Sequence, residues 1–261
     1  MDTSKGYVGS EHLHLLGNFL NGLKKSTYDC MKIKPGDKVL DVGCGSGIDT
    51  IGLSQIVGPT GQVCGVDYDM EMIRESEQHA EEEGVSAWVK HNQADATSLP
   101  FDTGYFDSCR CERLFQHLPN PAMVLKEMSR VTKVGGMVVA LDTDWGTLSV
   151  DTDENDIERR LALFHAEYML NNGFSGRQLY RLFKKQGLGN VSLEVFPIVV
   201  TNHALERQIV GTDQLEHEAI AKNIITEEEL QRYQANAEQA DSDGVYFGTC
   251  CMMLVSGQKM V

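Results

Sequence analysis

The chain has 261 residues, is 41% hydrophobic and carries a formal net charge of −15. This length suits one large α/β domain with insertions. The acidic excess repels a phosphate backbone and so disfavours a nucleic-acid partner. No apolar run approaches the roughly 18 residues of a membrane span, and the first residues do not resemble a secretion signal. We therefore expect a cytoplasmic protein with no membrane insertion.

Seven cysteines are present, and none forms a CxxC pair or lies at zinc-finger spacing with histidines. Cys109 and Cys111 lie two apart in an expected strand, and Cys250 and Cys251 are adjacent in another. Such positions are typical of small buried thiols. The pattern favours a reducing compartment and predicts no metal site.

Apolar runs alternate with helical patterns from residue 39 onward, which predicts βαβ units and a mostly parallel sheet. The expected elements are, in chain order, an N-terminal amphipathic helix (12–23), a strand (38–42), a helix ending near 57, a strand (62–66), a helix (71–84), strands at 88–92 and 106–111, a helix (121–131) and a strand (137–141). Asn120 can cap the helix at 121–131, and Pro121 suits its first turn.

The alternation loosens after residue 145. A charged amphipathic segment (151–172), a helix (175–187), a strand (191–200), a polar helical stretch (203–240) and a last strand (246–259) follow in that order. The fold class we predict is α/β: a Rossmann-like, seven-stranded, mostly parallel sheet with helices on both faces, an N-terminal helix and helical lid insertions. The expected units are an N-terminal helical cap (1–34), a core (35–145) and a C-terminal part (146–261) whose insertions 146–173 and 203–240 form a substrate lid.

A glycine-rich turn follows the first strand in the segment VLDVGCGSGIDT (39–50). Gly43, Gly45 and Gly47 allow backbone to approach a ligand closely. A dinucleotide fingerprint would need its third glycine at position 48, where the chain has Ile48. The spacing is therefore G-x-G-x-G, which argues against a dinucleotide.

Two carboxylates flank this turn. Asp41 lies two residues before the first glycine, where it would repel a pyrophosphate and attract an ammonium or a sulfonium. Asp67 ends the second strand, where an acidic side chain can accept from both ribose hydroxyls. S-adenosylmethionine (SAM) carries all of these groups. The alternative is that both aspartates are turn or cap residues beside a purely structural glycine turn.

Five motifs in the region 35–145 resemble, in this order, those of a class I SAM-dependent methyltransferase of the small-molecule type, related to the ubiquinone and menaquinone biosynthesis methyltransferases: VLDVGCGSG, GVDYDMEMI, ADATSLPF, FDSCRCERLFQHL and VTKVGGMVVALD. The resemblance fades after that region. It is specific for the family and weak for the substrate.

The resemblance implies a set of cofactor-binding residues. The methionine part would be held by Asp41, Gly43, Gly45 and Gly47, with Asp41 acting through the loop or a water. Asp67 would bind the ribose, and Tyr7, on a helix that closes over the cofactor in relatives, would approach the methionine carboxylate. The adenine would be contacted by Tyr68, Met72, Asp95 and the amide of Ala96. The channel toward the methyl group would be lined by Cys111, Glu112 and Arg113.

Catalysis needs no dedicated base, because the cofactor carries the reactive methyl group. If a base is used, the candidates at the strand ends are Glu112, His117 and Asp144. A Leu-His-His triplet common in the family appears here as residues 115–117, Phe-Gln-His, so the first imidazole is missing and a structural role for His117 stays open.

Trp145 and His165 are the candidate substrate-binding residues. Trp145, beside acidic residues, could hold a cationic or ring substrate, or it could pack the lid. His165 could line a substrate pocket or belong to an ordinary lid helix.

The predicted function is SAM-dependent transfer of a methyl group to an oxygen, nitrogen or carbon nucleophile of a small molecule, by a monomer or homodimer. The alternatives are a protein methyltransferase, a module that binds SAM without turnover and, less favoured, an NAD-dependent oxidoreductase.

Overall fold

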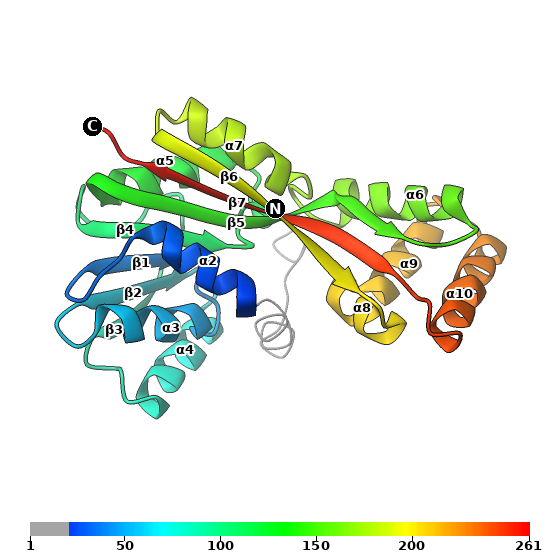
Figure 1. The fold of residues 1–261 in the computed structure, drawn as a ribbon, viewed down its shortest axis with the longest axis horizontal. Helices are drawn as coiled ribbons and strands as arrows, with labels where there is room; N and C mark the ends of the chain where they lie inside the picture. The colour runs from blue at the N-terminus through cyan, green and yellow to red at the C-terminus, as the bar shows by residue number, and fades with distance from the viewer. Residues whose placement is uncertain (1–20) are drawn as a thin grey trace.

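A computed structural model describes residues 21–261, so Tyr7 and most of the expected N-terminal helix lie outside the described residues. Seven strands form one sheet in the order β3-β2-β1-β4-β5-β7-β6 (Figure 1). Their bounds are β1 Lys38–Val42, β2 Gln62–Asp67, β3 Val89–Gln93, β4 Phe106–Glu112, β5 Thr132–Val150, β6 Gly189–Val200 and β7 Gly248–Gln258. The predicted fold class is confirmed.

The first five strands are parallel, whereas β7 runs antiparallel to both β5 and β6. Parallel strands end at the same edge of a sheet, and the loops that follow them meet there. The turns after β1, β2 and β4 are therefore neighbours, although 20 or more residues separate them along the chain.

Helices cover both faces of the sheet. One apolar cluster joins the sheet to α5 (Pro121–Val131) and α7 (Ser175–Lys185). A second joins the opposite face to α2 (Asn21–Met31), α3 (Ile48–Val57) and α4 (Met70–Glu82). The helix predicted at 121–131 is confirmed with Pro121 in its first turn, but the Asn120 side chain makes no capping hydrogen bond.

Strand β5 is much longer than the predicted strand at 137–141. Its residues Asp142, Thr143 and Asp144 continue the antiparallel ladder opposite Met253, Met252 and Cys251 of β7, and pairing resumes at Ser149 after an irregularity. The acidic residues and Gly146 conceal this extension in the sequence. The boundary expected at 145 and 146 therefore falls inside a strand.

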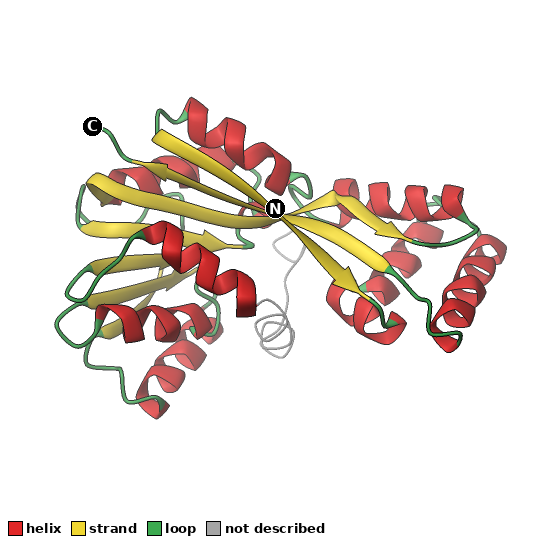
Figure 2. Ribbon diagram, in the orientation of Figure 1, coloured by secondary structure: helices red, strands yellow, loops and turns green. Residues whose placement is uncertain are grey.

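The extended strands lead to a second group of helices at the far end of the molecule, as Figure 2 shows. These helices are α6 (Asn155–Phe164), α8 (His203–Val210), α9 (Thr212–Ala221) and α10 (Glu227–Ser242). An apolar cluster that includes Leu161, Leu215 and Ala219 joins α6 to α9. We call α6, α8, α9 and α10 the distal helices. A single π-helical turn, η2 (His165–Met169), continues directly from α6.

Two further expectations can be compared with the described residues. All seven cysteines are free thiols, and Cys30 and Cys251 are the two that are not buried. Within residues 21–261, no helix has both the length and the apolar character that crossing a bilayer requires.

Candidate active site

The glycine-rich turn leaves β1 and enters α3 in a backbone conformation that only glycine adopts readily. Gly43, Gly45 and Gly47 have φ values of 74°, 50° and 86°. A Cβ atom added at Gly47 would lie 2.8 Å from the Cβ atom of Ser76. The backbone angles therefore favour glycine at all three positions, and close packing adds a steric requirement at Gly47.

Asp67 holds this turn in place from the end of β2. Its Oδ2 accepts from the amide of Gly45 at 2.9 Å, and its Oδ1 accepts from the amide of Asp69 at 3.0 Å. Burial raises the pKa of Asp67, although these backbone hydrogen bonds oppose the shift. The carboxylate thus links the two loops that the sequence assigned to one ligand.

The loop after β3 lies beside Asp67, because the amide of Ala94 donates to the Asp67 carbonyl at 2.9 Å. Tyr68 is exposed and Met72 is buried. The Asp95 carboxylate is exposed and accepts from the amide and the hydroxyl of Thr97. Asp67, Tyr68, Asp95 and Ala96 therefore belong to adjoining loops, and their contacts with adenosine stay predictions.

The side-chain oxygen of Ser46, in the glycine-rich turn, indicates that the turn binds a ligand. The Ser46 hydroxyl is buried and has no hydrogen-bond partner among the described residues. Buried polar atoms are nearly always paired, so an unpaired hydroxyl beside three required glycines fits a loop that binds a polar ligand. The residues present therefore fit SAM, the group that the resemblance implies.

Asp41 is buried and points to a cation of the protein itself. Its Oδ1 lies 3.6 Å from Nη1 of Arg110, a fully buried side chain in the middle of β4. Burial raises the pKa of Asp41 in spite of this arginine. Strand pairing of β1 with β4 brings Arg110 to Asp41, a partner that the sequence analysis did not foresee, and the expected contact of Asp41 with the ligand's ammonium through the loop or a water stays a prediction.

Arg110 is the centre of a buried charge cluster that the sequence analysis missed. Its guanidinium lies 2.9 Å from Asp49 and 2.8 Å from Glu112. Lys24 of α2 reaches the same carboxylates, at 2.6 Å from Asp49 and 3.4 Å from Glu112, and the Tyr28 hydroxyl donates to Asp49 at 2.6 Å. An arginine inside the apolar run of β4 was the available signal. With Arg113 at 3.6 Å as well, Glu112 is paired with three cations, which disfavours it as a base.

Cys111 requires a correction. Its side chain is fully buried in the apolar cluster beneath α5, on the opposite face of β4 from Arg110 and Glu112. It therefore packs the core and does not line a channel. Arg113, which follows at the strand end, has a φ of 51° and donates its amide to the Leu141 carbonyl.

A short 3-10 turn, η1 (Phe115–His117), follows β4 and is held by Asp142. The buried Asp142 carboxylate accepts from the amides of Phe115 at 2.7 Å and Gln116 at 3.3 Å, and from the hydroxyl of Ser175 at 2.9 Å. Burial raises the pKa of Asp142 to about 7. Asp142 directly follows the strand expected at 137–141, and its role depends on contacts with η1 and α7.

Hydrogen bonds connect η1 to the candidate substrate residues. Nε2 of His117 lies 3.0 Å from the side-chain nitrogen of Gln116, and the Gln116 carbonyl oxygen Oε1 accepts from the Trp145 indole at 2.8 Å. The Trp145 and His165 rings lie 4.4 Å apart between centroids. Burial lowers the pKa of both His117 and His165 to about 4, so both imidazoles are neutral at pH 7. The structure thus brings His117, Trp145 and His165 into one neighbourhood.

Asp144 also requires a correction, because it is neither in a loop nor free. It lies within β5, is buried, and forms two hydrogen bonds with Nε of Arg177 at 2.7 and 2.8 Å. A carboxylate paired in this way is a poor proton acceptor. The long strand β5 explains the error.

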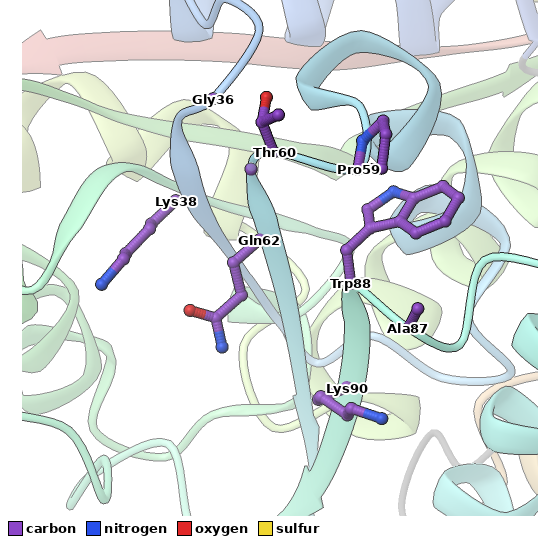
Figure 3. Close-up of a pocket in the computed structure, with 9 residues that line it drawn as sticks. Gly36, Lys38, Pro59, Thr60, Gln62, Ala87, Trp88 and Lys90 are labelled. Carbon is purple, nitrogen blue, oxygen red and sulfur yellow. The ribbon is translucent and has the colours of Figure 1, made fainter.

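A separate groove lies at the other ends of the strands. It is lined by residues that precede or begin β1, β2 and β3, including Lys38, Gln62, Trp88 and Lys90 (Figure 3). The glycine-rich turn follows the opposite end of β1. This groove is therefore distinct from the candidate active site.

The strand order, with one antiparallel strand inserted beside β5, a glycine turn after β1 and an acid at the end of β2, defines the class I methyltransferase fold. The chain belongs to the ubiE/COQ5 methyltransferase family, whose sequence model matches residues 19–152. This match confirms the family resemblance that the sequence motifs predicted.

Three known proteins show how far the similarity extends. The 37.1 kDa protein in transposon TN4556 of Streptomyces fradiae is 29% identical over 80% of this chain and 60% of its own length. Demethylmenaquinone methyltransferase of Staphylococcus carnosus is 39% identical over 49% of this chain and 52% of its own length. The solved geranyl diphosphate C-methyltransferase of Streptomyces coelicolor, in complex with Mg²⁺, geranyl diphosphate and S-adenosyl-L-homocysteine, has a TM-score of 0.60 at 15% identity and covers 98% of this chain and 86% of its own.

These matches differ in how much of each chain they cover. The chain spans between half and two thirds of the length of the two curated relatives. The structural likeness includes the distal helices, and it shows the fold alone.

Proposed function

We propose that this protein transfers a methyl group from SAM to a small-molecule acceptor. The observation that carries the proposal is the glycine-rich turn held by Asp67: three glycines with positive φ, a carboxylate bonded to the Gly45 amide, and the unpaired Ser46 hydroxyl. Family membership supports the same reaction.

Different residues of the site bind different parts of SAM. Gly43, Gly45 and Gly47 let the backbone approach the methionine part, and Asp67 accepts from the ribose hydroxyls with its remaining lone pairs. Tyr68 and Asp95 hold the adenine. The buried cluster around Arg110 fixes the positions of α2, α3 and β4 relative to one another, next to the glycine-rich turn. SAM, when bound, supplies a methyl group on a positively charged sulfur with a neutral thioether as leaving group.

The protein's contribution to rate is positioning. Holding two reactants in near-attack geometry supplies roughly 7–11 kcal/mol, more than a single general base usually adds. Among the predicted bases, Glu112 and Asp144 are occupied by cations. His117 stays neutral at pH 7, but its Nε2 accepts from the side-chain amide of Gln116 at 3.0 Å. All three predicted bases thus have partners within the protein, in keeping with catalysis by positioning.

A small-molecule acceptor agrees with several features. The net charge of −15 disfavours nucleic acid. The structural neighbour from Streptomyces coelicolor acts on geranyl diphosphate, and the Staphylococcus relative is a demethylmenaquinone methyltransferase. We place the protein in the cytoplasm, in keeping with its free cysteines, and as a monomer or homodimer.

Calorimetry on the full chain tests the cofactor. We expect heat on titration with SAM or S-adenosylhomocysteine and none with NAD; the reverse would refute the proposal. Transfer of label from methyl-labelled SAM in a cell extract then tests the acceptor. Label in the small-molecule fraction is expected, whereas label in protein alone would identify a protein methyltransferase.

A further inference from the structure

His165 occupies the first position of the π-helical turn η2, between α6 and α7. Its Nε2 lies 3.3 Å from the carbonyl oxygen of Val210. A carbonyl oxygen only accepts, so Nε2 carries the proton and Nδ1 carries a lone pair. Only 4% of the residue is exposed, and Nδ1 has no hydrogen-bond partner among the described residues. The ring is thus fixed with one buried acceptor unused.

Two observations indicate that this acceptor serves a ligand. Buried polar atoms in native proteins are rarely unpaired, and an exception calls for a functional or solvent partner. Single π-helical turns within helices are frequent at functional sites. Burial also lowers the pKa of His165 to about 4, so its lone pair is available at pH 7.

Apart from the Val210 carbonyl bonded to Nε2, the ring packs against aromatic and apolar side chains. His165 lies against the Trp145 ring, in a cluster completed by Ala166, Leu170 and Phe174. A charged ligand would be poorly solvated here, whereas a neutral group with a polar hydrogen would be stabilised.

The cluster is also connected to the end of β4. The Trp145 indole donates to Gln116, which is adjacent to His117 in η1. The free acceptor is therefore linked through Trp145 and Gln116 to the turn that follows β4, where the methyl group is expected.

We propose that Nδ1 of His165 accepts a hydrogen bond from a neutral hydroxyl or amino group of the methyl acceptor. This inference rests on the proposed function and narrows its substrate to an apolar molecule that carries an O–H or N–H. An analogue without that hydrogen leaves Nδ1 unpaired, so the site should favour the donor by about tenfold or more.

The test uses the full chain with S-adenosylhomocysteine and pairs of small probes that differ in one polar hydrogen: phenol with anisole, and aniline with N,N-dimethylaniline. Nitrogen-15 NMR of the histidine rings reports the state of Nδ1. We expect an unprotonated Nδ1 whose resonance shifts with phenol or aniline and not with their methylated partners.

Two variants separate the two ring nitrogens. His165→Gln keeps a donor for the Val210 carbonyl and loses the acceptor at Nδ1, so it should retain its melting temperature and lose the preference for phenol. His165→Asn keeps an acceptor near the Nδ1 position and should retain part of that preference.

Several outcomes would overturn the inference: a protonated Nδ1, a lone pair occupied by water that no probe displaces, or equal affinities within both probe pairs. Binding of S-adenosylhomocysteine is measured separately in the same samples. Its absence would contradict the proposed function, whereas its presence with equal probe affinities would contradict the role of His165 alone.

Discussion

At the scale of single residues, Asp67 shows how a local pattern becomes a site. The side chain bonds to Gly45 across a separation of 22 residues, and this contact was foreseeable because β1 and β2 are adjacent parallel strands. The same reasoning could not find the partner of Asp41, since Arg110 reaches it from β4, far along the chain. The ion pair of Arg177 with Asp144 and the hydrogen bonds from η1 to Asp142 were also missed, because they too join segments that are far apart along the chain.

Replacing Asp67 with Ala should weaken SAM binding by about 10- to 100-fold, which corresponds to about 1.5–3 kcal/mol for a lost charged hydrogen bond. Calorimetry measures the change. Asp69→Ala is the matched control: Asp69 caps α4 through the Glu71 amide, so its loss should lower stability and spare SAM affinity. Unchanged affinity in Asp67→Ala would contradict the assignment of the ribose site.

Replacing Gly47 with Ala should destabilise the fold and reduce SAM affinity. The alanine would have to adopt the φ of 86° that Gly47 has, and its Cβ atom would lie 2.8 Å from the Cβ atom of Ser76. Gly84→Ala has a similar φ of 69° with open space around it, so it isolates the backbone cost of about 1 kcal/mol. Urea unfolding should show a further loss of about 1–3 kcal/mol in Gly47→Ala from overpacking. Equal losses in the two variants would rule out the steric contribution.

At the scale of elements, the attachment of α2 to the sheet depends on buried charges as well as apolar packing. Lys24 bridges Asp49 at the start of α3 and Glu112 at the end of β4. The helix is therefore tied to α3, which follows the glycine-rich turn, and to β4, the strand that pairs with β1. The helix expected at 12–23 ends near the start of α2, so the sequence analysis predicted neither most of α2 nor the carboxylates that Lys24 meets.

Replacing Lys24 with Met should lower the free energy of unfolding by about 3 kcal/mol, because it leaves two buried carboxylates short of a cation. Lys25→Met on the exposed side of the same helix should have little effect. Urea unfolding measures both, and amide exchange should rise in α2 of the first variant alone. Equal stabilities would show that the cluster does not stabilise the docking of α2.

Strand β5 is the element that sequence analysis described least well. Its second half follows polar residues and Gly146, and it remains a strand because β7 pairs with it through Cys251. Pairing across more than 100 residues supplies hydrogen bonds that no local propensity predicts. The same pairing carries Trp145 into the neighbourhood of His165.

At the scale of the whole molecule, stability responds to pH through groups with opposite shifts. Burial raises the pKa of Asp142 and Glu206 to about 7, so acidification from pH 7 stabilises the folded state through them. Burial lowers the pKa of His91 and His165 to about 4. The unfolded histidines bind protons below about pH 6.5, so acidification destabilises the folded state through them. The pH dependence of the free energy of unfolding is the sum of these opposite contributions. A variant that removes one titrating group measures the contribution of that group.

The comparison of the wild type with His165→Gln isolates one histidine. Between pH 7 and pH 5 the wild type should lose about 2 kcal/mol relative to the variant, because His165 in the folded state stays neutral while it protonates in the unfolded state. Urea unfolding at both pH values gives the difference. A constant difference would mean that the folded pKa of His165 is close to its ordinary value.

The sequence alone determined the α/β alternation, the glycine-rich turn and the acid at the end of β2, because hydrophobic periodicity and backbone conformation act over neighbouring residues. Tertiary structure decided which charge meets Asp41, how far β5 extends, and that Val210 of α8 orients the ring of His165. Those features depend on contacts between segments that are distant along the chain, where burial and pairing override local preference.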